Sequence, residues 1–309
     1  MNAPPATGRL TPGLVLLLCM PPLMWAGNAV VGRMMVGLAP PLALNALRWT
    51  LALLLLLPLG WRVFRRPGEV WARRHHLALL GLAGVGSYNA LQYVAVQTST
   101  PLNITLIAAS SPLWMLAIGA LWHGVRPRPV QWVGAGFSLA GVLLVLSRGS
   151  VETLRSVSLV PGDLLMLVAI ASWAIYSWML ARPPASMQPP RRPAWDWAEF
   201  LLVQVCFGLG WATLAAAAEV ASDPVPIRWS VGVVAAIVFV AVGPSIVAYY
   251  CWGKGVAAVG PSTTAFFGNL TPVFAALLSA ALLGQAPHWY HFAAFALIAA
   301  GIIVTSRAR

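Results

Sequence analysis

Long apolar runs separated by short polar segments fill most of the chain. Each run is close to the roughly 20 residues that an α-helix needs to cross a bilayer. The runs lack the strict apolar–polar alternation of membrane-barrel strands, so we expect helices. The pattern predicts ten membrane spans, at residues 12–32, 40–60, 76–96, 102–122, 129–147, 161–181, 197–218, 231–252, 261–283 and 288–306.

The second half of the chain repeats the first. A shift of 160 residues without a gap places three prolines of the first half on three of the second: Pro101 on Pro261, Pro112 on Pro272 and Pro127 on Pro287. Each copy holds an odd number of spans, so the second copy is upside down in the membrane. We therefore expect an all-α membrane protein with ten transmembrane helices in two inverted five-helix repeats, residues 1–150 and 151–309. This architecture is typical of secondary transporters.

The composition excludes a soluble globular protein, because 60% of the residues are hydrophobic and only 8% are charged. The net charge of +12 is distributed unevenly between the two sides of the membrane. Of the 19 basic residues, 14 fall on the side of the N-terminus, four on the other side, and Arg48 lies within a span. The positive-inside rule places both termini in the cytoplasm. The basic excess thus indicates topology and contact with anionic lipid, and no nucleic acid partner.

Short motifs follow one another in a characteristic order. They are Trp25-Ala-Gly-Asn28 followed by Arg33, Ala46-Leu-Arg48, Ala90-Leu-Gln-Tyr93, Gln131-Trp-Val-Gly134, Trp173-Ala-Ile-Tyr176 and Asn269-Leu-Thr-Pro272. In order, spacing and duplication the chain resembles the drug/metabolite transporter superfamily, specifically its ten-span EamA-type exporters. The resemblance implies a multi-pass inner-membrane exporter of small molecules. The chain departs from the family at Val125 and Gln285, where a Glu commonly follows the Gly that ends spans four and nine.

The polar residues form no catalytic constellation. All seven carboxylates lie in loops or at span ends, and the sequence shows no Ser/His/Asp arrangement, metal-ligand spacing or phosphate-binding loop. We therefore expect no enzyme, no metal and no cofactor. Proton-driven carriers usually place Asp, Glu or His within the membrane. Their absence at depth predicts facilitated transport, with Asp163 at the start of span six as the best candidate for a relay.

Arg48 is the one strongly ionic side chain deep in a predicted span. It lies roughly 12 Å from the outer end of span two, at a rise of about 1.5 Å per residue. An unpaired Arg at this depth costs at least a few kcal/mol, so it needs polar partners. Two interpretations stay open: a contact for a substrate carboxylate, or a structural Arg that ties helices by binding backbone carbonyls.

The repeat also predicts a central cavity, because equivalent faces of inverted repeats tend to meet at the transport site. Spans four and nine carry matching stripes at helical spacing: Asn103, Ile107, Ser111 and Trp114, then Thr263, Phe267, Thr271 and Phe274. The other central spans add Trp25, Asn28, Trp173, Tyr176, Tyr88, Asn89, Gln92, Tyr93, Tyr249, Tyr250 and Trp252. Alternatively, the aromatic residues are interface anchors and the amides bond across helices. Pro112 and Pro272 are flexing points or static bends within their helices.

These features predict a secondary transporter that moves a small amphipathic metabolite, such as an amino acid, by alternating access. Two alternatives are a multidrug-like exporter of aromatic or cationic compounds, which should carry a deep carboxylate, and a membrane-embedded enzyme or scaffold. Small residues in spans five and ten predict close packing, within one chain or in a homodimer. The Pro- and Arg-rich segment 182–196 predicts a semi-rigid or disordered cytoplasmic linker.

Overall fold

The computed structural model describes residues 10–155, 157–283 and 288–307. Within these ranges the regular structure is helical, without a strand, so the prediction of an all-α membrane protein is confirmed. Gln285 and Pro287 lie outside the described residues. The elements are α1 (Pro12–Met34), α2 (Pro41–Gly60), η1 (Trp61–Arg65), α3 (Pro67–Trp71), α4 (Arg74–Gly81), η2 (Leu82–Ser87), α5 (Tyr88–Thr98), α6 (Pro101–Ala109), α7 (Ser111–His123), α8 (Pro129–Leu146), α9 (Val151–Arg155), α10 (Pro161–Ala181), η3 (Ala185–Met187), α11 (Trp197–Ser222), α12 (Val231–Val240), η4 (Ala241–Val247), α13 (Ala248–Gly268), α14 (Thr271–Leu283) and α15 (Trp289–Arg307).

Eight helices of the described ranges are long and apolar enough to cross a membrane, and α6 with α7 makes a ninth if this bent pair is one span. The longest candidate, Val231–Gly268, is interrupted at Gly260, whose φ of 78° and ψ of 161° are not helical. Glycine adopts a positive φ without the steric cost that a side chain adds. The part of α13 that follows Gly260 leads into α14. In the same way, α6 leads into α7 in the first half of the chain. The count of ten spans stays a prediction.

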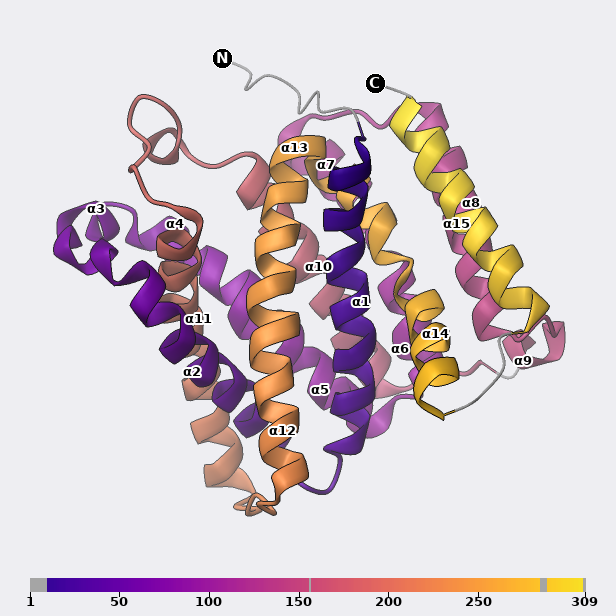
Figure 1. Ribbon diagram of the computed structural model, residues 1–309, viewed down its shortest axis with the longest axis horizontal. Helices are drawn as coiled ribbons and strands as arrows, with labels where there is room; N and C mark the ends of the chain where they lie inside the picture. The colour runs from indigo at the N-terminus through magenta and orange to yellow at the C-terminus, as the bar shows by residue number, and fades with distance from the viewer. Residues whose placement is uncertain (1–9, 156, 284–287, 308–309) are drawn as a thin grey trace.

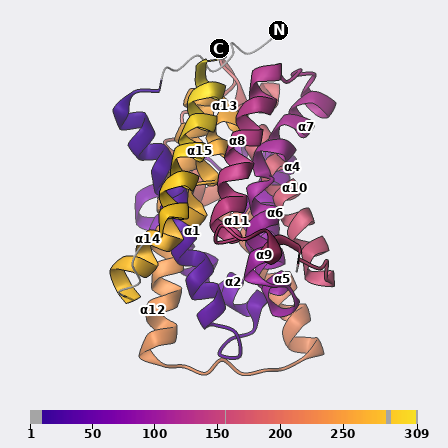
Figure 2. The same ribbon diagram turned by 90° about the vertical axis from the view of Figure 1, so that its right-hand side faces the viewer.

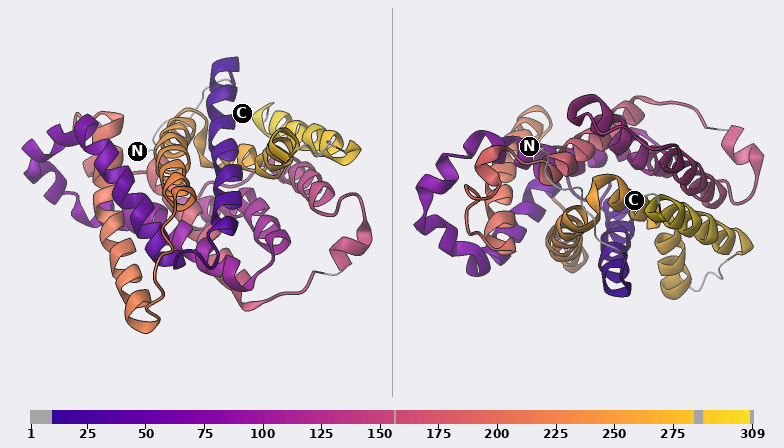
Figure 3. Two further views of the ribbon diagram at one scale, coloured as in Figure 1. Left: turned by 60° about the horizontal axis from the view of Figure 1, so that its bottom comes forward. Right: turned by 90° about the horizontal axis from the view of Figure 1, so that it is seen from above.

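The helices form three groups across the bundle (Figure 1). On one flank α8 and α15 pack along each other, as Figure 2 also shows. On the opposite flank α2 and α4 pack against α11, and α1, α5, α10 and α13 lie between the flanks (Figure 3). The start of α1 and the end of α15 lie at the same end of the bundle, and α9 lies beside the opposite end of the α8–α15 pair (Figure 1).

Glycines explain the close pairing of α8 with α15. A Cβ atom on Gly134 would lie 2.9 Å from the carbonyl oxygen of Gly301, and one on Gly141 would lie 2.8 Å from that of Ala294. The two backbones therefore approach to a distance that larger side chains would prevent, as in other membrane helix pairs. The small residues of these helices thus serve packing within one chain, and a homodimer stays a prediction.

Two π-helical segments interrupt central helices at positions that the 160-residue shift superposes: η2 lies between α4 and α5, and η4 lies between α12 and α13. A π turn disturbs the regular bonding of nearby carbonyls. Side chains bond to two of these carbonyls: the Tyr249 hydroxyl donates to Gly84 O, and Ser245 Oγ donates to Val240 O over 2.8 Å. The interruptions are therefore fixed by specific contacts.

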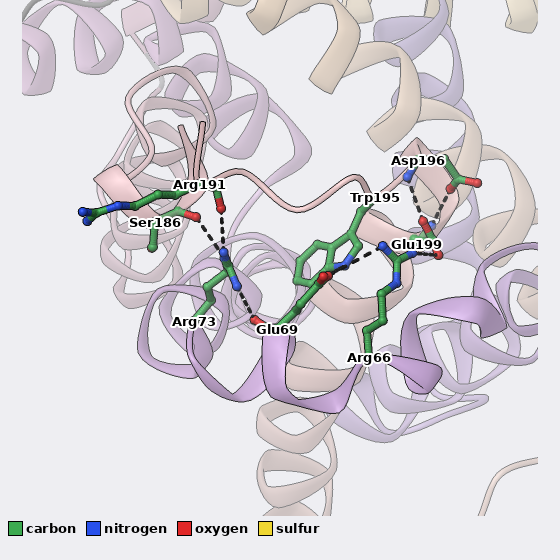
Figure 4. A network of polar contacts seen from close by, with 8 residues as sticks. All are labelled: Arg66, Glu69, Arg73, Ser186, Arg191, Trp195, Asp196 and Glu199. Carbon is green, nitrogen blue, oxygen red and sulfur yellow. Dashed lines mark hydrogen bonds and ion pairs between the residues drawn. The ribbon is translucent and has the colours of Figure 1, made fainter. Parts of the chain in front are cut away.

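The segment 182–196 is held in place, which differs from the prediction of a semi-rigid or disordered linker (Figure 4). Arg73 donates from Nε to the Ser186 carbonyl over 2.9 Å and from Nη2 to the Arg191 carbonyl over 2.7 Å. The indole Nε1 of Trp195 donates to Oε2 of Glu69 over 2.9 Å. The prolines and arginines of segment 182–196 indicated a linker, but Arg73 satisfies two of its backbone carbonyls and Glu69 binds its Trp195 side chain.

Candidate functional site

A cavity of about 90 Å³ lies in the centre of the bundle, between α1, α5, α6, α7, α10, α13 and α14. Aromatic, amide, hydroxyl and small apolar side chains form its wall, and no charged side chain of the described residues lines it. The lining residues are Trp25, Asn28, Ala29, Tyr88, Gln92, Ile104, Thr105, Ala108, Ala109, Ser111, Ile170, Trp173, Trp252, Gly268, Asn269, Thr271 and Pro272.

Two helix breaks border this cavity. Helices α6 and α7 meet at an angle of 42° at Ser110, and α14 begins at Thr271 after α13 ends at Gly268. Pro112 and Pro272 are the second residues of α7 and α14, where a missing N–H interrupts no helical hydrogen bond. The prolines thus begin a second helix instead of kinking a continuous one. Ser111 and Thr271, the first residues of these helices, both line the cavity.

Aromatic rings gather around Trp173 on α10. The ring centroids of Trp25, Tyr88 and Trp252 lie 5.2, 5.3 and 5.1 Å from that of Trp173. Trp25 meets Trp173 edge-on, at an interplanar angle of 90°. Aromatic pairs attract each other in such geometries, by about 0.5–1.5 kcal/mol beyond their burial. The cluster therefore holds α1, α5, α10 and α13 together while it forms one side of the cavity.

The guanidinium of Arg48 lies beside the cavity in a fully buried polar cluster. Its Nη1 donates to Asn28 Oδ1 over 3.2 Å, to Asn89 Oδ1 over 2.9 Å and to the Tyr93 hydroxyl over 2.8 Å. Its Nε and Nη2 donate to Ser245 Oγ over 3.0 and 2.8 Å. These bonds offset the cost of burying the charge, and they tie α2 to α1, α5 and η4.

Neither interpretation of Arg48 describes these contacts fully. Arg48 does tie helices together, but its acceptors are side chains instead of backbone carbonyls. Arg48 does not line the cavity, whereas Asn28, one of its acceptors, does. Arg48 therefore reaches the cavity wall by contact only through Asn28, while its charge lies close behind that wall.

Comparison with known proteins identifies the family. A family model described as the EamA-like transporter family matches the chain twice, over residues 12–147 and 160–307. The chain belongs to the EamA-like transporter family. The resemblance to the drug/metabolite transporter superfamily is thereby confirmed, and transport is the activity that the family name indicates.

Relatives of this EamA-like chain are transporters by name. The uncharacterized transporter YyaM of Bacillus subtilis is 29% identical over 205 residues, which cover 66% of this chain and 64% of YyaM. The aromatic amino acid exporter YddG of Ancylobacter novellus is 27% identical over 291 residues, which cover 92% of this chain and 93% of YddG. A protein crystal structure that is 24% identical in sequence matches this chain with a TM-score of 0.72. The match covers 94% of this chain and 96% of the crystallised chain, so the two share a fold.

The structure divides the predicted site residues of this EamA-like transporter into two groups. On the cavity wall lie Trp25, Asn28, Tyr88, Gln92, Ser111, Trp173, Trp252 and Thr271. Away from the wall lie Arg48, Asn89, Tyr93, Asn103, Ile107, Trp114, Tyr176, Tyr249, Tyr250, Thr263, Phe267 and Phe274. The predicted stripes assumed continuous helices through spans four and nine, and the breaks change the helical phase along both stripes. Substrate contact by any of these residues stays a prediction.

Asp163, the predicted relay candidate, is 1% exposed at the start of α10 and does not line the cavity. Its carboxylate accepts hydrogen bonds from the Ser99 hydroxyl, from Asn103 Nδ2 over 2.7 Å and from the Val160 N–H over 2.9 Å. Asp163 therefore joins the end of α5 and the start of α6 to α10. A relay role for it stays a prediction.

Asn269 lines the cavity, although sequence reasoning did not assign it to the site. It is 2% exposed, and its Nδ2 donates to Ser138 Oγ of α8 over 2.8 Å. The sequence could have indicated this residue, because Asn269 stands two residues before Thr271. It lies at the break between α13 and α14, which corresponds in the repeat to the break between α6 and α7. Polar residues at broken helices are candidates for transport sites.

Proposed function

We propose that this EamA-like transporter moves a small amphipathic metabolite, an amino acid or a close relative of one, across the inner membrane by alternating access. The observation that carries the proposal is the cavity wall, which combines four aromatic rings with amides and hydroxyls. Its described residues include no charged side chain. Such a wall favours a solute with an apolar body and a few polar groups.

The relatives support an amino acid as the solute. YddG, which aligns with 92% of this chain, is named an aromatic amino acid exporter. In this chain Trp25, Tyr88, Trp173 and Trp252 present rings to the cavity, and an aromatic or long apolar side chain of a solute can pack against them. A carrier for cations normally places a carboxylate at its site, and the described cavity wall has none.

Alternating access is supported by the size of the cavity and by the helix breaks. About 90 Å³ is well below the roughly 300 Å³ at which ligand pockets begin, so an amino acid requires the surrounding helices to separate. Half-helices that meet at Ser110, and those on either side of Gly268, can tilt relative to each other. Other secondary transporters also have broken helices at a central site, around which the two repeats move against each other.

The test is counterflow with purified protein in liposomes. Liposomes are loaded with one unlabelled amino acid at a time, and entry of the labelled form is measured against protein-free liposomes. We expect counterflow of at least one aromatic or large apolar amino acid. Trp25→Ala should slow it by about tenfold, because ring contacts are lost. Trp132→Ala, at an exposed position of α8, is the matched control and should change it little. Failure of every amino acid to exchange would contradict the proposal.

A further inference from the structure

We propose that the side-chain amide of Asn28 donates a hydrogen bond to a carboxylate of the transported solute, and that Arg48 and Tyr93 are positioning residues for this amide. The inference rests on the proposed function and narrows it to solutes that carry a carboxylate next to an apolar group. It replaces a direct contact from Arg48, which does not line the cavity.

The orientation of the Asn28 amide follows from its partners. Asn28 Oδ1 accepts from Arg48 Nη1 over 3.2 Å and from the Tyr93 hydroxyl over 2.9 Å. A guanidinium has only donors, so the amide oxygen has to face Arg48. The Nδ2 group is then the free end of the amide, with no hydrogen-bond partner among the described residues. Because Asn28 is 3% exposed and lines the cavity, this donor is available to a solute there and not to bulk water.

The charge of Arg48 makes this part of the cavity attractive to an anion. The four acceptors of Arg48 are neutral side chains, and within the described residues no carboxylate forms an ion pair with it. The guanidinium also polarises the amide that it binds, which strengthens the donor at the other end of the amide. Since no cationic side chain of the described residues lines the cavity itself, the site fits one carboxylate better than a phosphate.

A second donor lies on the same cavity. Ser111 is 8% exposed, and its hydroxyl has no hydrogen-bond partner in the described part of the chain. Ser111 is also the first residue of α7, a helix of 13 residues whose positive dipole end therefore borders the cavity. The cavity thus combines an amide N–H, a hydroxyl and a helix N-terminus as ligands for a carboxylate with aromatic rings that suit an apolar group.

Asn28→Asp is the decisive substitution. Aspartate has the same shape and keeps an acceptor for Arg48 and Tyr93, but it lacks the donor and brings a negative charge to the cavity wall. Asn89→Asp is the matched control, because Asn89 also accepts from Arg48, is equally buried at 3% exposure, and does not line the cavity. Both variants bring the same charge next to Arg48, and they differ in whether a solute meets it.

The measurement is the binding of L-tryptophan and of tryptamine, which lacks the carboxylate, to full-length protein by calorimetry. We expect the wild type to prefer tryptophan and Asn28→Asp to lower the ratio of the two dissociation constants by about tenfold or more. Asn89→Asp should lower the ratio by less than about threefold. Tyr93→Phe removes one of the two bonds that orient Asn28, and one acceptor of Arg48, without a change of charge. It should lower the ratio moderately in protein that remains folded.

Four outcomes would overturn the inference. An unchanged ratio in Asn28→Asp, in protein that still exchanges amino acids, refutes the role of Asn28 and leaves the proposed function standing. Equal losses in Asn28→Asp and Asn89→Asp assign the effect to the charge of Arg48 and not to the amide. If Asn28→Asp does not fold, an unchanged ratio in Tyr93→Phe decides against the inference. A wild type that exchanges no amino acid refutes the proposed function and the inference with it.

Discussion

Nη2 of Arg66 lies 3.0 Å from Oε1 of Glu199, and this ion pair links the segment after α2 to the first turn of α11. The side chain of Glu199 is 6% exposed, whereas that of Arg66 is 36% exposed. The other oxygen of Glu199 accepts from the Asp196 N–H over 2.9 Å, so the same carboxylate caps α11 (Figure 4). The pair therefore fastens the first half of the chain to the second.

Arg66→Ala should lower the stability of the protein, because it leaves a nearly buried carboxylate without its cation. We expect a loss of about 1–2 kcal/mol, less than for a fully buried pair because Arg66 is partly exposed. The control is Arg155→Ala, whose pair with Glu152 spans 3.8 Å at 74% and 83% exposure and should contribute almost nothing. Unfolding in detergent measures both, and an equal loss in the two variants would refute the importance of the Arg66 pair.

Gly134→Val should disrupt the packing of α8 against α15. A Cβ at Gly134 would lie 2.9 Å from the Gly301 carbonyl, whereas one at Gly136 on the same helix meets nothing within 4 Å. We expect Gly134→Val to cost roughly 1–3 kcal/mol through overpacking and Gly136→Val to be nearly neutral. The melting temperature in detergent distinguishes them. Similar melting temperatures for the two variants would show that α8 and α15 are not in tight contact.

Reporters fused in the segments 61–75 and 182–196 should report the cytoplasm, and those in 148–160 and 219–230 the outside. The bias of basic residues, 14 against four, leads to this expectation. The structure contributes the hydrogen bonds between the first two segments, which require both on one side. If a reporter fused within 148–160 is found in the cytoplasm, the inverted orientation of the second repeat is also refuted.

A pH gradient should not concentrate a zwitterionic amino acid in liposomes. The cavity wall contains no carboxylate or histidine among the described residues, so flux should follow the gradient of the solute in both directions. Accumulation driven by the pH gradient and lost in Asp163→Asn would contradict this. Since Asp163 joins α5, α6 and α10, that result would also tie proton binding to the position of α6.

The helices were predictable because apolar runs of membrane length are a strong signal. The run predicted at 161–181 coincides with α10, Pro161–Ala181. The division of the chain near Gly260 was harder to predict, because local composition hardly distinguishes a positive-φ glycine from a helical one in an apolar run. The orderly bonding of segment 182–196 depends on partners such as Arg73, which lies far away in the sequence.

The candidate site was predictable where helices are unbroken. Trp25 and Asn28 on α1 share a face because they stand three residues apart, and both line the cavity. Along α6 and α7 the same rule fails at Ser110, and Asn103 and Trp114 lie away from the wall. The sequence located Arg48 at depth, but its partners come from other helices and follow from tertiary packing alone.

Each π-helical segment adds one residue to a turn. The side chains that follow it are therefore rotated by about 100° about the helix axis, compared with their positions in an uninterrupted α-helix. Tyr88 directly follows η2, Gln92 stands one turn later, and both face the cavity. If η2 became a plain α-helix with all its residues kept, these side chains would turn away from the cavity without any change in sequence. Rotational register is therefore a determinant of specificity in its own right. Two family members with identical wall residues in an alignment can thus present different surfaces to a solute.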